Sequence, residues 1–590
     1  MCVRSRFLSL LTLAVLLVAT GAGAQTYLDL EGQIQEFTLD NGVHFVVLER
    51  HDVPVFSFRT FVNVGSANEV RGITGLSHIL EHMAFKGTSE IGTKNHKKEI
   101  KLMAAEDVAF DQLKAARRAS VPVVAKYDRL LESISEESLD SYLEMESLLR
   151  DQPAEAQLDV PGDDPYDMQP GQNADVTIRH GMGTENEAVK DFQANREQAI
   201  ALAYFLAEVR QVRENLIAAE EGFEAAKDAA RELVVTNEFG KIIENNGGNG
   251  LNAYTSSDVT VYHYNFPSNR LELWAYLEGS RMADPVLREF YTEKDGPVTE
   301  ERRMRTDNNP IGRMIEQFQN LMFIANGYHH STIGYMSDIN TISRADCRAY
   351  YNEHYVGSNM VVTLVGDVYL DDVKKFAKKY FSDIPKGDPE IIETTEPKQL
   401  GEKRFVMKDP SQPLFVAGYH IGNVRTPDWP VYEVIADVLG QGRTSRLYKK
   451  LVKEDGIAVQ AMTFPGFPGQ KYDTGMLVFA LPVKGKTGYD MEKAIFAEID
   501  DIVANGITED ELAAVKQRTR ANFIRGLGGN GGMASQLAWY QTYTGDWRNL
   551  FREVDTINAV TQADVKRVAA EVFTQTNRTV AIIETEEDDS

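Results

Sequence analysis

Two histidines spaced four residues apart are the strongest chemical feature of this 590-residue sequence. His78 and His82 form the only such pair among its 11 histidines, and Glu81 lies between them in the string GLSHILEHMAFKGT. On a helix, residues at i and i+4 share one face, so both imidazoles can reach one ion with the Glu81 carboxylate beside it. A zinc ion lowers the pKa of bound water to ~7, and a neighbouring carboxylate can take its proton and pass it to a leaving amine. Peptide hydrolysis needs those two parts.

HxxEH is the inverted zinc motif, and the wider sequence strongly resembles the pitrilysin and insulinase family of zinc metallopeptidases. The resemblance is greatest to the mitochondrial-processing-peptidase-like branch, in its bacterial secreted form. It includes NAYTS, SNMVVTLVGDV from Ser358 and GRTSRLYKKL from Gly442. Asn252, Ala253 and Tyr254 resemble the family strand that lies along a bound peptide, so we expect substrate to add as a strand to an exposed sheet edge.

The resemblance also implies an activity, a cofactor and roles for the motif residues. The two histidines of HxxEH would hold one Zn2+ per chain, and the glutamate between them would be the general base. The implied function is a zinc-dependent metalloendopeptidase that hydrolyses unfolded peptides or exported protein segments. The alternative is a non-catalytic binding or assembly subunit of a peptidase-like heterodimer, against which the intact HxxEH argues.

The third ligand in this family is a glutamate on a later helix, within a pattern like ERDVVxEE. The corresponding segment, TEKDGPVTEERRMR, contains one extra residue. Counting forward by seven from Glu293 gives Glu300, whereas anchoring on the downstream EERRMR gives Glu301. We predict Glu301, because Pro297 suits the first turn of a helix and should restart the register there. Glu293 would then be a second catalytic carboxylate, one that supports and orients the site.

Two positions depart from the pattern of relatives that are active alone. In those relatives the second half supplies an Arg and a Tyr within a pattern like LREExGLAY, and these bind substrate near the metal. Here the matching positions are Val452 and Val459. We therefore expect a homologous peptidase-family chain as a partner, which supplies the missing Arg and Tyr.

An internal repeat indicates the architecture. The segment from Ile339 runs parallel, without gaps, to the segment from Ile557, at a constant offset of 218 residues. Each copy reads as a helix with a capping residue, Ser343 or Thr561, followed by a loop and an apolar strand. The sequence therefore predicts an α+β fold of two homologous mixed α/β domains, the clamshell halves of a metallopeptidase, with a long helical insertion in the first.

The expected domains follow from changes in composition along the chain. Residues 25–385 form the N-terminal catalytic zinc peptidase domain, within which residues 97–238, rich in Ala, Glu, Lys and Leu at helical spacing, form the helical insertion. A polar linker spans residues 386–403. Residues 404–590 form the homologous, non-catalytic C-terminal domain.

The first 24 residues indicate a periplasmic or secreted protein. Arg4 and Arg6 precede an apolar run that ends in small residues, which is typical of a signal peptide cleaved after Ala24. The run is shorter than the ~20 residues of a membrane span, so no span is expected after cleavage. Cleavage leaves Cys347 as the single cysteine, which excludes an internal disulfide. A net charge of -26 argues against a nucleic-acid partner.

Overall fold

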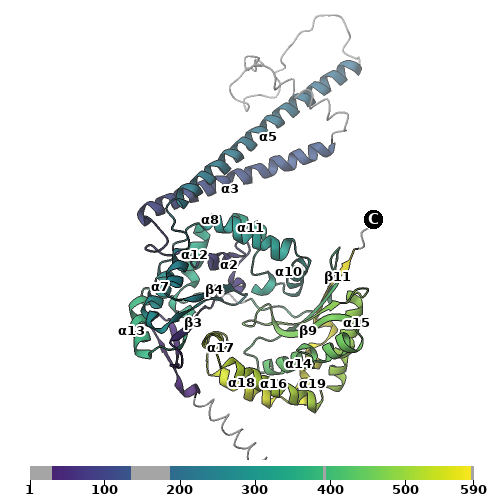
Figure 1. Cartoon of the computed structure of the whole chain (residues 1–590). Helices are drawn as coiled ribbons and strands as arrows, with labels where there is room; N and C mark the ends of the chain where they lie inside the picture. The colour runs from purple at the N-terminus through teal and green to yellow at the C-terminus, as the bar shows by residue number, and fades with distance from the viewer. Residues whose placement is uncertain (1–29, 134–186, 390–393, 587–590) are drawn as a thin grey trace, which may run out of the picture. The chain divides into compact units, whose positions relative to one another are not determined.

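The computed structural model describes residues 30–133, 187–389 and 394–586 (Figure 1). The predicted signal peptide, residues 1–24, lies outside these residues, as does the middle of the predicted helical insertion. The chain forms two compact units, one made of Met1–Lys101 with Ala230–Ser590 and the other of Leu102–Ala229. Among the described residues, no helix combines the length and the apolar character that crossing a membrane requires.

The first half of the larger unit contains a six-stranded mixed sheet in the order β1-β2-β6-β3-β5-β4. Its strands are β1 Ile34–Thr38, β2 His44–Glu49, β3 Val55–Val62, β4 Asn249–Thr255, β5 Thr260–Pro267 and β6 Met360–Gly366. Its helices are α2 Leu76–Met83, α6 Glu238–Asn245, α7 Leu271–Ala283, α8 Phe290–Glu293, α9 Thr299–Arg302, α10 Pro310–Met322, α11 Met336–Thr341, α12 Arg344–His354 and α13 Leu370–Tyr380. β4 lies at the edge of this sheet and, among the described strands, pairs with β5 alone.

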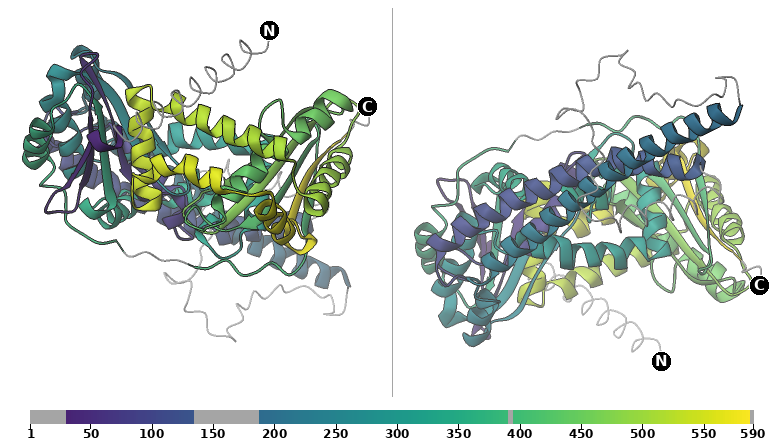
Figure 2. Two further views of the ribbon diagram at one scale, coloured as in Figure 1. Left: turned by 90° about the horizontal axis from the view of Figure 1, so that it is seen from below. Right: turned by 90° about the horizontal axis from the view of Figure 1, so that it is seen from above.

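The second half contains a five-stranded sheet in the order β7-β11-β8-β10-β9. Its strands are β7 Lys403–Asp409, β8 Leu414–Ile421, β9 Ala458–Phe467, β10 Thr474–Pro482 and β11 Arg578–Thr585. Its helices are α14 Trp429–Gly440, α15 Gly488–Asn505, α16 Glu509–Gly526, α17 Asn530–Thr544, α18 Asn549–Ala559 and α19 Gln562–Val572. Helices α14, α15 and α19 cover one face of this sheet (Figures 1 and 2).

The internal repeat is visible in hydrogen bonds at the predicted offset. Ser343 caps α12 and Thr561 caps α19, each through a reciprocal capping box. After the helix, the side-chain amide of Asn359 donates to the carbonyl of His354, and that of Asn577 donates to the carbonyl of Val572, both at 2.9 Å. Two copies of one local structure therefore precede the central strands β6 and β11.

The two sheets also share one topology. In each, the central strand pairs in parallel with one neighbour, β2 or β7, and antiparallel with the other, β3 or β8. The remaining strands follow in the same order, so β4 corresponds to β9, and α2 corresponds to α14 because each follows the equivalent strand. The repeated mixed half confirms the predicted fold class.

Each half contributes one helix to the sheet of the other half. Met314, Phe318 and Met322 of α10 pack on Leu414 and Val416 of β8, which belongs to the second sheet. Conversely, α17 packs on β3 and β6 of the first sheet. This exchange buries a sheet face on each side without any covalent cross-link, which accords with the buried, unpaired Cys347.

The smaller unit consists of two long helices, α3 His96–Ser133 and α5 Glu187–Arg231, which extend beyond its boundaries at both ends. Phe110 of α3 contacts Phe223 of α5, and the centroids of the two rings are 5.6 Å apart. Arg117 and Glu220 form an exposed ion pair between them at 3.8 Å. The two helices therefore pack as a hairpin along this part of their length.

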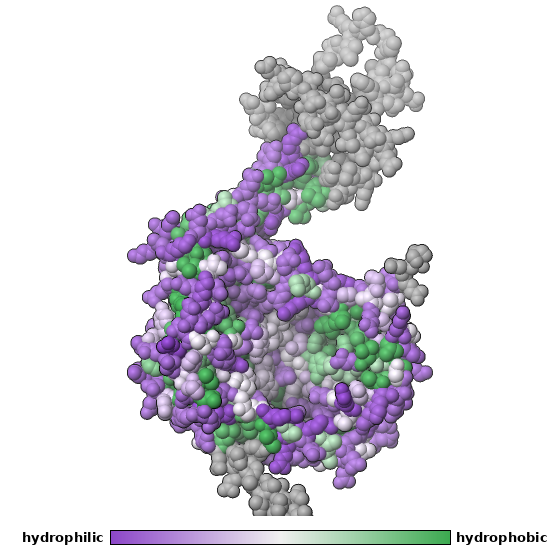
Figure 3. All heavy atoms as spheres, viewed as in Figure 1, coloured by the Kyte–Doolittle hydropathy of each residue, from purple (hydrophilic) through white to green (hydrophobic). Residues whose placement is uncertain are grey.

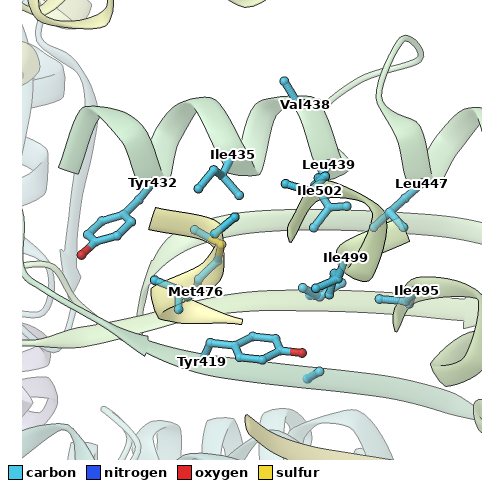
Figure 4. Packing of buried hydrophobic residues seen from close by; sticks show 14 of the residues in the cluster. Tyr419, Tyr432, Ile435, Val438, Leu439, Leu447, Met476, Ile495, Ile499 and Ile502 are labelled. Atoms are coloured by element: carbon cyan, nitrogen blue, oxygen red, sulfur yellow. The ribbon is translucent and has the colours of Figure 1, made fainter. Parts of the chain in front are cut away.

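Helix α14 contributes one face to the core of the second half. Tyr432, Ile435 and Leu439 recur at helical spacing; Ile435 points toward Met476 of β10, and Leu439 lies beside Ile502 of α15 (Figure 4). Such contacts supply most of the stability of an amphipathic helix.

We expect the substitution Leu439→Ala to lower the free energy of unfolding by about 2–5 kcal/mol, because it removes a fully buried side chain and leaves a cavity. Leu400→Ala is the matched control, since Leu400 is 87% exposed and its loss should cost under about 0.5 kcal/mol. Urea unfolding followed by circular dichroism measures both. Equal effects of the two substitutions would contradict the packing described.

Candidate functional site

Helix α2 is held by contacts at its N-terminus. It begins after Gly75, whose φ of 91° is left-handed and where a Cβ would lie 2.5 Å from the carbonyl oxygen of Ile333. Glycine is therefore required there. The buried Glu69 carboxylate accepts hydrogen bonds from the backbone N–H groups of Gly75 and Ser77, both at 2.7 Å. This cap fixes the first turn of α2 and so the direction in which His78 points.

The structure brings together the three predicted metal ligands. Nε2 of His78 lies 3.6 Å from Oε2 of Glu301, and Nε2 of His82 lies 3.4 Å from the same oxygen. Ligands about 2.0–2.1 Å from a tetrahedral zinc ion lie about 3.4 Å from one another, so this spacing fits the ion. Within the described parts of the chain, this is the one group of His, Cys, Asp or Glu side chains arranged to hold a metal.

A π-helical turn sets which of the two candidate glutamates lies beside the histidines. The sequence predicted that the helix restarts at Pro297, and this is wrong. The helix instead continues through the π-helical segment Lys294–Val298. A π-turn accommodates one extra residue in a helix, so Glu301 occupies the place that a seven-residue count from Glu293 gives to Glu300. The Glu301 side chain is 22% exposed, whereas that of Glu300 is 59% exposed and pairs with Arg303.

Burial and neighbouring charges shift the pKa values of the site residues in different directions. Burial lowers the pKa of His78 to about 3, so its imidazole is neutral and offers a lone pair at ordinary pH. Burial also lowers the pKa of His82, but the carboxylates of Glu293, Glu81 and Glu301 outweigh it and raise that pKa overall. Burial raises the pKa of Glu81 above its ordinary value, which suits a group that must take up a proton.

Glu293 lies behind His82, on the side away from Glu301. Its Oε2 is 3.5 Å from Nδ1 of His82, and its other oxygen pairs with Lys86. Burial raises the pKa of Glu293, but His82 and Lys86 lower it overall, so the carboxylate is ionised. A carboxylate in this position sets the tautomer and orientation of a ligating histidine.

Sequence reasoning missed two cations beside the site. Lys86 pairs with Glu293 and, at 3.3 Å, with Glu289, while Nη1 of Arg305 lies 2.9 Å from Oε1 of Glu301. The available signal for Arg305 was spacing, because it follows Glu301 by four residues, whereas Lys86 lies beyond the end of α2. Residues at that spacing are neighbours on a helix surface.

We expect Glu293→Gln to weaken metal binding by roughly 10–100-fold, the usual cost of losing an outer-shell partner of a metal ligand. Competitive titration against a zinc-chelating dye measures the change. Glu289→Gln is the control, because it removes the other carboxylate near Lys86 without touching a histidine. If the two variants bound zinc equally tightly, Glu293 would not be orienting His82.

The residues expected along the substrate lie on the edge strand β4, against which α2 packs. Asn252 pairs with His263 of β5, and the side chains of Asn252 and Tyr254 are exposed. The outer edge of β4, including Ala253, pairs with no strand of the described chain. An extended peptide can therefore form backbone hydrogen bonds beside α2.

The two valines lie in the second half. Val452 belongs to the π-helical segment Tyr448–Glu454 and packs partly buried on the core around α14. Val459 is the second residue of β9 and is 56% exposed. Neither side chain offers a polar group to a substrate.

The two repeated mixed α/β halves form a two-domain fold that solved structures share. A protease from Helicobacter pylori superposes with a TM-score of 0.65 at 22% identity, covering 93% of this chain and 99% of that one. The peptidase M16 inactive domain from Pseudomonas fluorescens superposes with a TM-score of 0.63 at 13% identity, covering 94% and 99%.

Sequence comparison gives the family. Residues 45–115 match Insulinase (Peptidase family M16), and residues 341–519 match Peptidase M16 inactive domain. Zinc protease PqqE of Helicobacter pylori (strain ATCC 700392 / 26695) is 30% identical over 362 residues, which cover 59% of this chain and 78% of that protein. Mitochondrial-processing peptidase subunit beta of Blastocladiella emersonii is 24% identical over 338 residues, covering 56% and 71%. The chain belongs to peptidase family M16, the insulinase family.

Proposed function

We propose that this chain is a zinc-dependent metalloendopeptidase in which His78, His82 and Glu301 hold the metal and Glu81 is the general base. The proposal rests on the convergence of Nε2 of His78 and Nε2 of His82 on one carboxylate oxygen of Glu301, at 3.6 and 3.4 Å. Glu81 belongs to α2, the helix that carries both histidines. The relatives described as zinc proteases support zinc as the metal.

Bound by these residues, zinc would supply a Lewis acid that polarises a scissile carbonyl and acidifies water. Glu81 takes the proton of the attacking water and passes it to the leaving amine. Glu293 holds the imidazole of His82 in place from behind, and Lys86 holds Glu293. The exposed edge of β4 binds the peptide in an extended conformation through its backbone.

Unfolded peptides or exported protein segments are the proposed substrates. Backbone pairing to β4 recognises extended shape more than sequence, and unfolded chains also expose apolar side chains. Apolar residues gather over the second-half strands, where Figure 1 labels β9 and β11 (Figure 3). The partly buried Phe405, Met407, Phe479 and Leu481 of β7 and β10 also pack against a hydrophobic cluster of this sheet. The two halves, residues 25–385 and 404–590, would enclose such a peptide between them.

A homologous partner chain is proposed to complete the substrate site. Val452 and Val459 stand where an Arg and a Tyr would contact substrate, so a partner would supply both side chains. The sequence relative from Blastocladiella emersonii is itself described as a subunit. We also propose export to the periplasm through the signal peptide of residues 1–24, since a protease of related fold from Escherichia coli is described as periplasmic.

Metal removal tests the proposed activity. We expect the mature chain to contain one zinc ion, and to hydrolyse a quenched, unstructured peptide once a homologous chain that carries the Arg and Tyr is added. Dialysis against a chelator should abolish hydrolysis, and stoichiometric zinc should restore it. Zinc without turnover in either condition would favour the non-catalytic subunit, and strong activity of the monomer alone would refute the shared site.

A further inference from the structure

A cavity of about 500 Å3 lies within the second half, between α14, α16, α17, α18 and β9. This volume falls in the range of small-molecule sites, roughly 300–1,000 Å3. Trp429, Phe464 and Tyr540 provide aromatic walls, and Glu433 and Glu553 provide carboxyl groups. All of these residues lie outside the candidate metal site.

The cavity occupies the place in the second half that corresponds to the metal site in the first. α14 is the topological counterpart of α2, and the edge strand β9 is the counterpart of the edge strand β4. On α14, Glu433 and Asp437 repeat the i, i+4 spacing of His78 and His82, and both line the cavity. The fold therefore places charged side chains beside an edge strand twice, with different chemistry each time.

The charges that face this cavity are incompletely balanced. Arg518 neutralises Asp437, to which its guanidinium donates. By contrast, no Lys, Arg or His of the described chain forms an ion pair with Glu433 or Glu553, and the charge of Glu553 acts on Glu433. Burial, with Glu553 nearby, raises the pKa of Glu433 to about 7, and burial also raises that of Glu553.

The hydrogen bonds to these two acids come from the aromatic walls. The indole N–H of Trp429 donates to Glu433 at 3.0 Å, and the hydroxyl of Tyr540 donates to Glu553. These neutral donors orient the two carboxyl groups but supply no positive charge to balance them when they ionise. Carboxylates without a cation in a half-buried cavity favour a positively charged occupant.

We infer that this cavity binds a small organic cation, an ammonium or guanidinium group held between Glu433 and Glu553 and stacked against Trp429. Aromatic faces attract such cations, whereas a bare metal ion would leave the aromatic walls without a partner. Among the described residues, no metal-type cluster includes these acids. The inference does not depend on the proposed peptidase activity.

The ammonium or guanidinium group could belong to a free small molecule or to the side chain of a lysine or arginine within a peptide. Isothermal titration of the full mature chain separates them with agmatine as the free cation and acetyl-Gly-Arg-Gly-amide as the peptide. N-butylurea is the uncharged analogue of agmatine. We expect at least one cationic probe to bind and N-butylurea to bind at least 10-fold more weakly.

Two charge-removing variants test the assignment to this cavity. Glu433→Gln and Glu553→Gln should each weaken binding of the cationic probe at least 10-fold, and the double variant should abolish it. The control is Glu571→Gln, which removes an exposed carboxylate of α19 in the same half and should bind as the wild type does. Trp429→Leu should also weaken binding, which provides a second test if a glutamine variant fails to fold.

Failure of both cationic probes to bind the wild type would overturn the inference, as would unchanged binding by the double variant or equal binding of N-butylurea. Binding of agmatine would identify a free cation as sufficient, and binding of the peptide alone would identify a basic side chain.

Discussion

Glu301→Ala is expected to remove zinc from the purified protein and to abolish hydrolysis with it. Glu301 offers Oε2 to both histidines at 3.4 and 3.6 Å, so its loss leaves two imidazoles with no third donor. The loss of affinity should exceed the roughly 10–100-fold that removal of an outer-shell partner costs. Atomic absorption after dialysis against a weak chelator measures the retained metal.

Glu300→Ala is the matched control for this experiment, because it removes the neighbouring carboxylate from the same helix. Glu300 is exposed and pairs with Arg303 rather than with the histidines. This variant should retain stoichiometric zinc and wild-type activity. The reverse result, with zinc lost from Glu300→Ala and kept by Glu301→Ala, would show that the helix has a different register when metal is bound.

Glu81→Gln should lower kcat by roughly 10²–10⁴-fold, the usual contribution of a general acid–base group. Glutamine keeps the size of the side chain and can hydrogen-bond, but it cannot accept the proton. Zinc content should stay at one per chain, because Glu81 is not among the three converging ligand atoms. Single-turnover hydrolysis of a quenched peptide, measured with the partner chain present, reports the rate.

Retained zinc is what makes this variant informative. If Glu81→Gln lost the metal, its inactivity would reflect an empty site and not the missing base. If it kept both zinc and full activity, another group would have to accept the proton, and the proposed role of Glu81 would be wrong.

Much of the fold could be predicted because its signals are local. The caps at Ser343 and Thr561 are made by residues three positions apart, and the offset of 218 aligns two helix-strand units without gaps. The pairing of His78 and His82 on one helix face is likewise a matter of spacing along the chain. Such features depend on few distant contacts, so the sequence alone indicates them.

The rest depends on the backbone or on distant segments. The residue count alone could not decide between Glu300 and Glu301, because a π-helical turn rather than a new helix start absorbs the extra residue. The cavity with Glu433 and Glu553 forms only when α14 and α18 pack together, and neither acid lies in a recognisable local motif. Local sequence patterns do not predict such contacts between distant helices.

The exchange of α10 and α17 between the halves bears on how the gene could evolve. Each half covers an apolar sheet face of the other. Fission of the gene at the linker would leave each product with such a face exposed to water. Both products would then have to be made together and associate as they fold. Neither half would therefore be suited to recombine as a separate domain into other proteins.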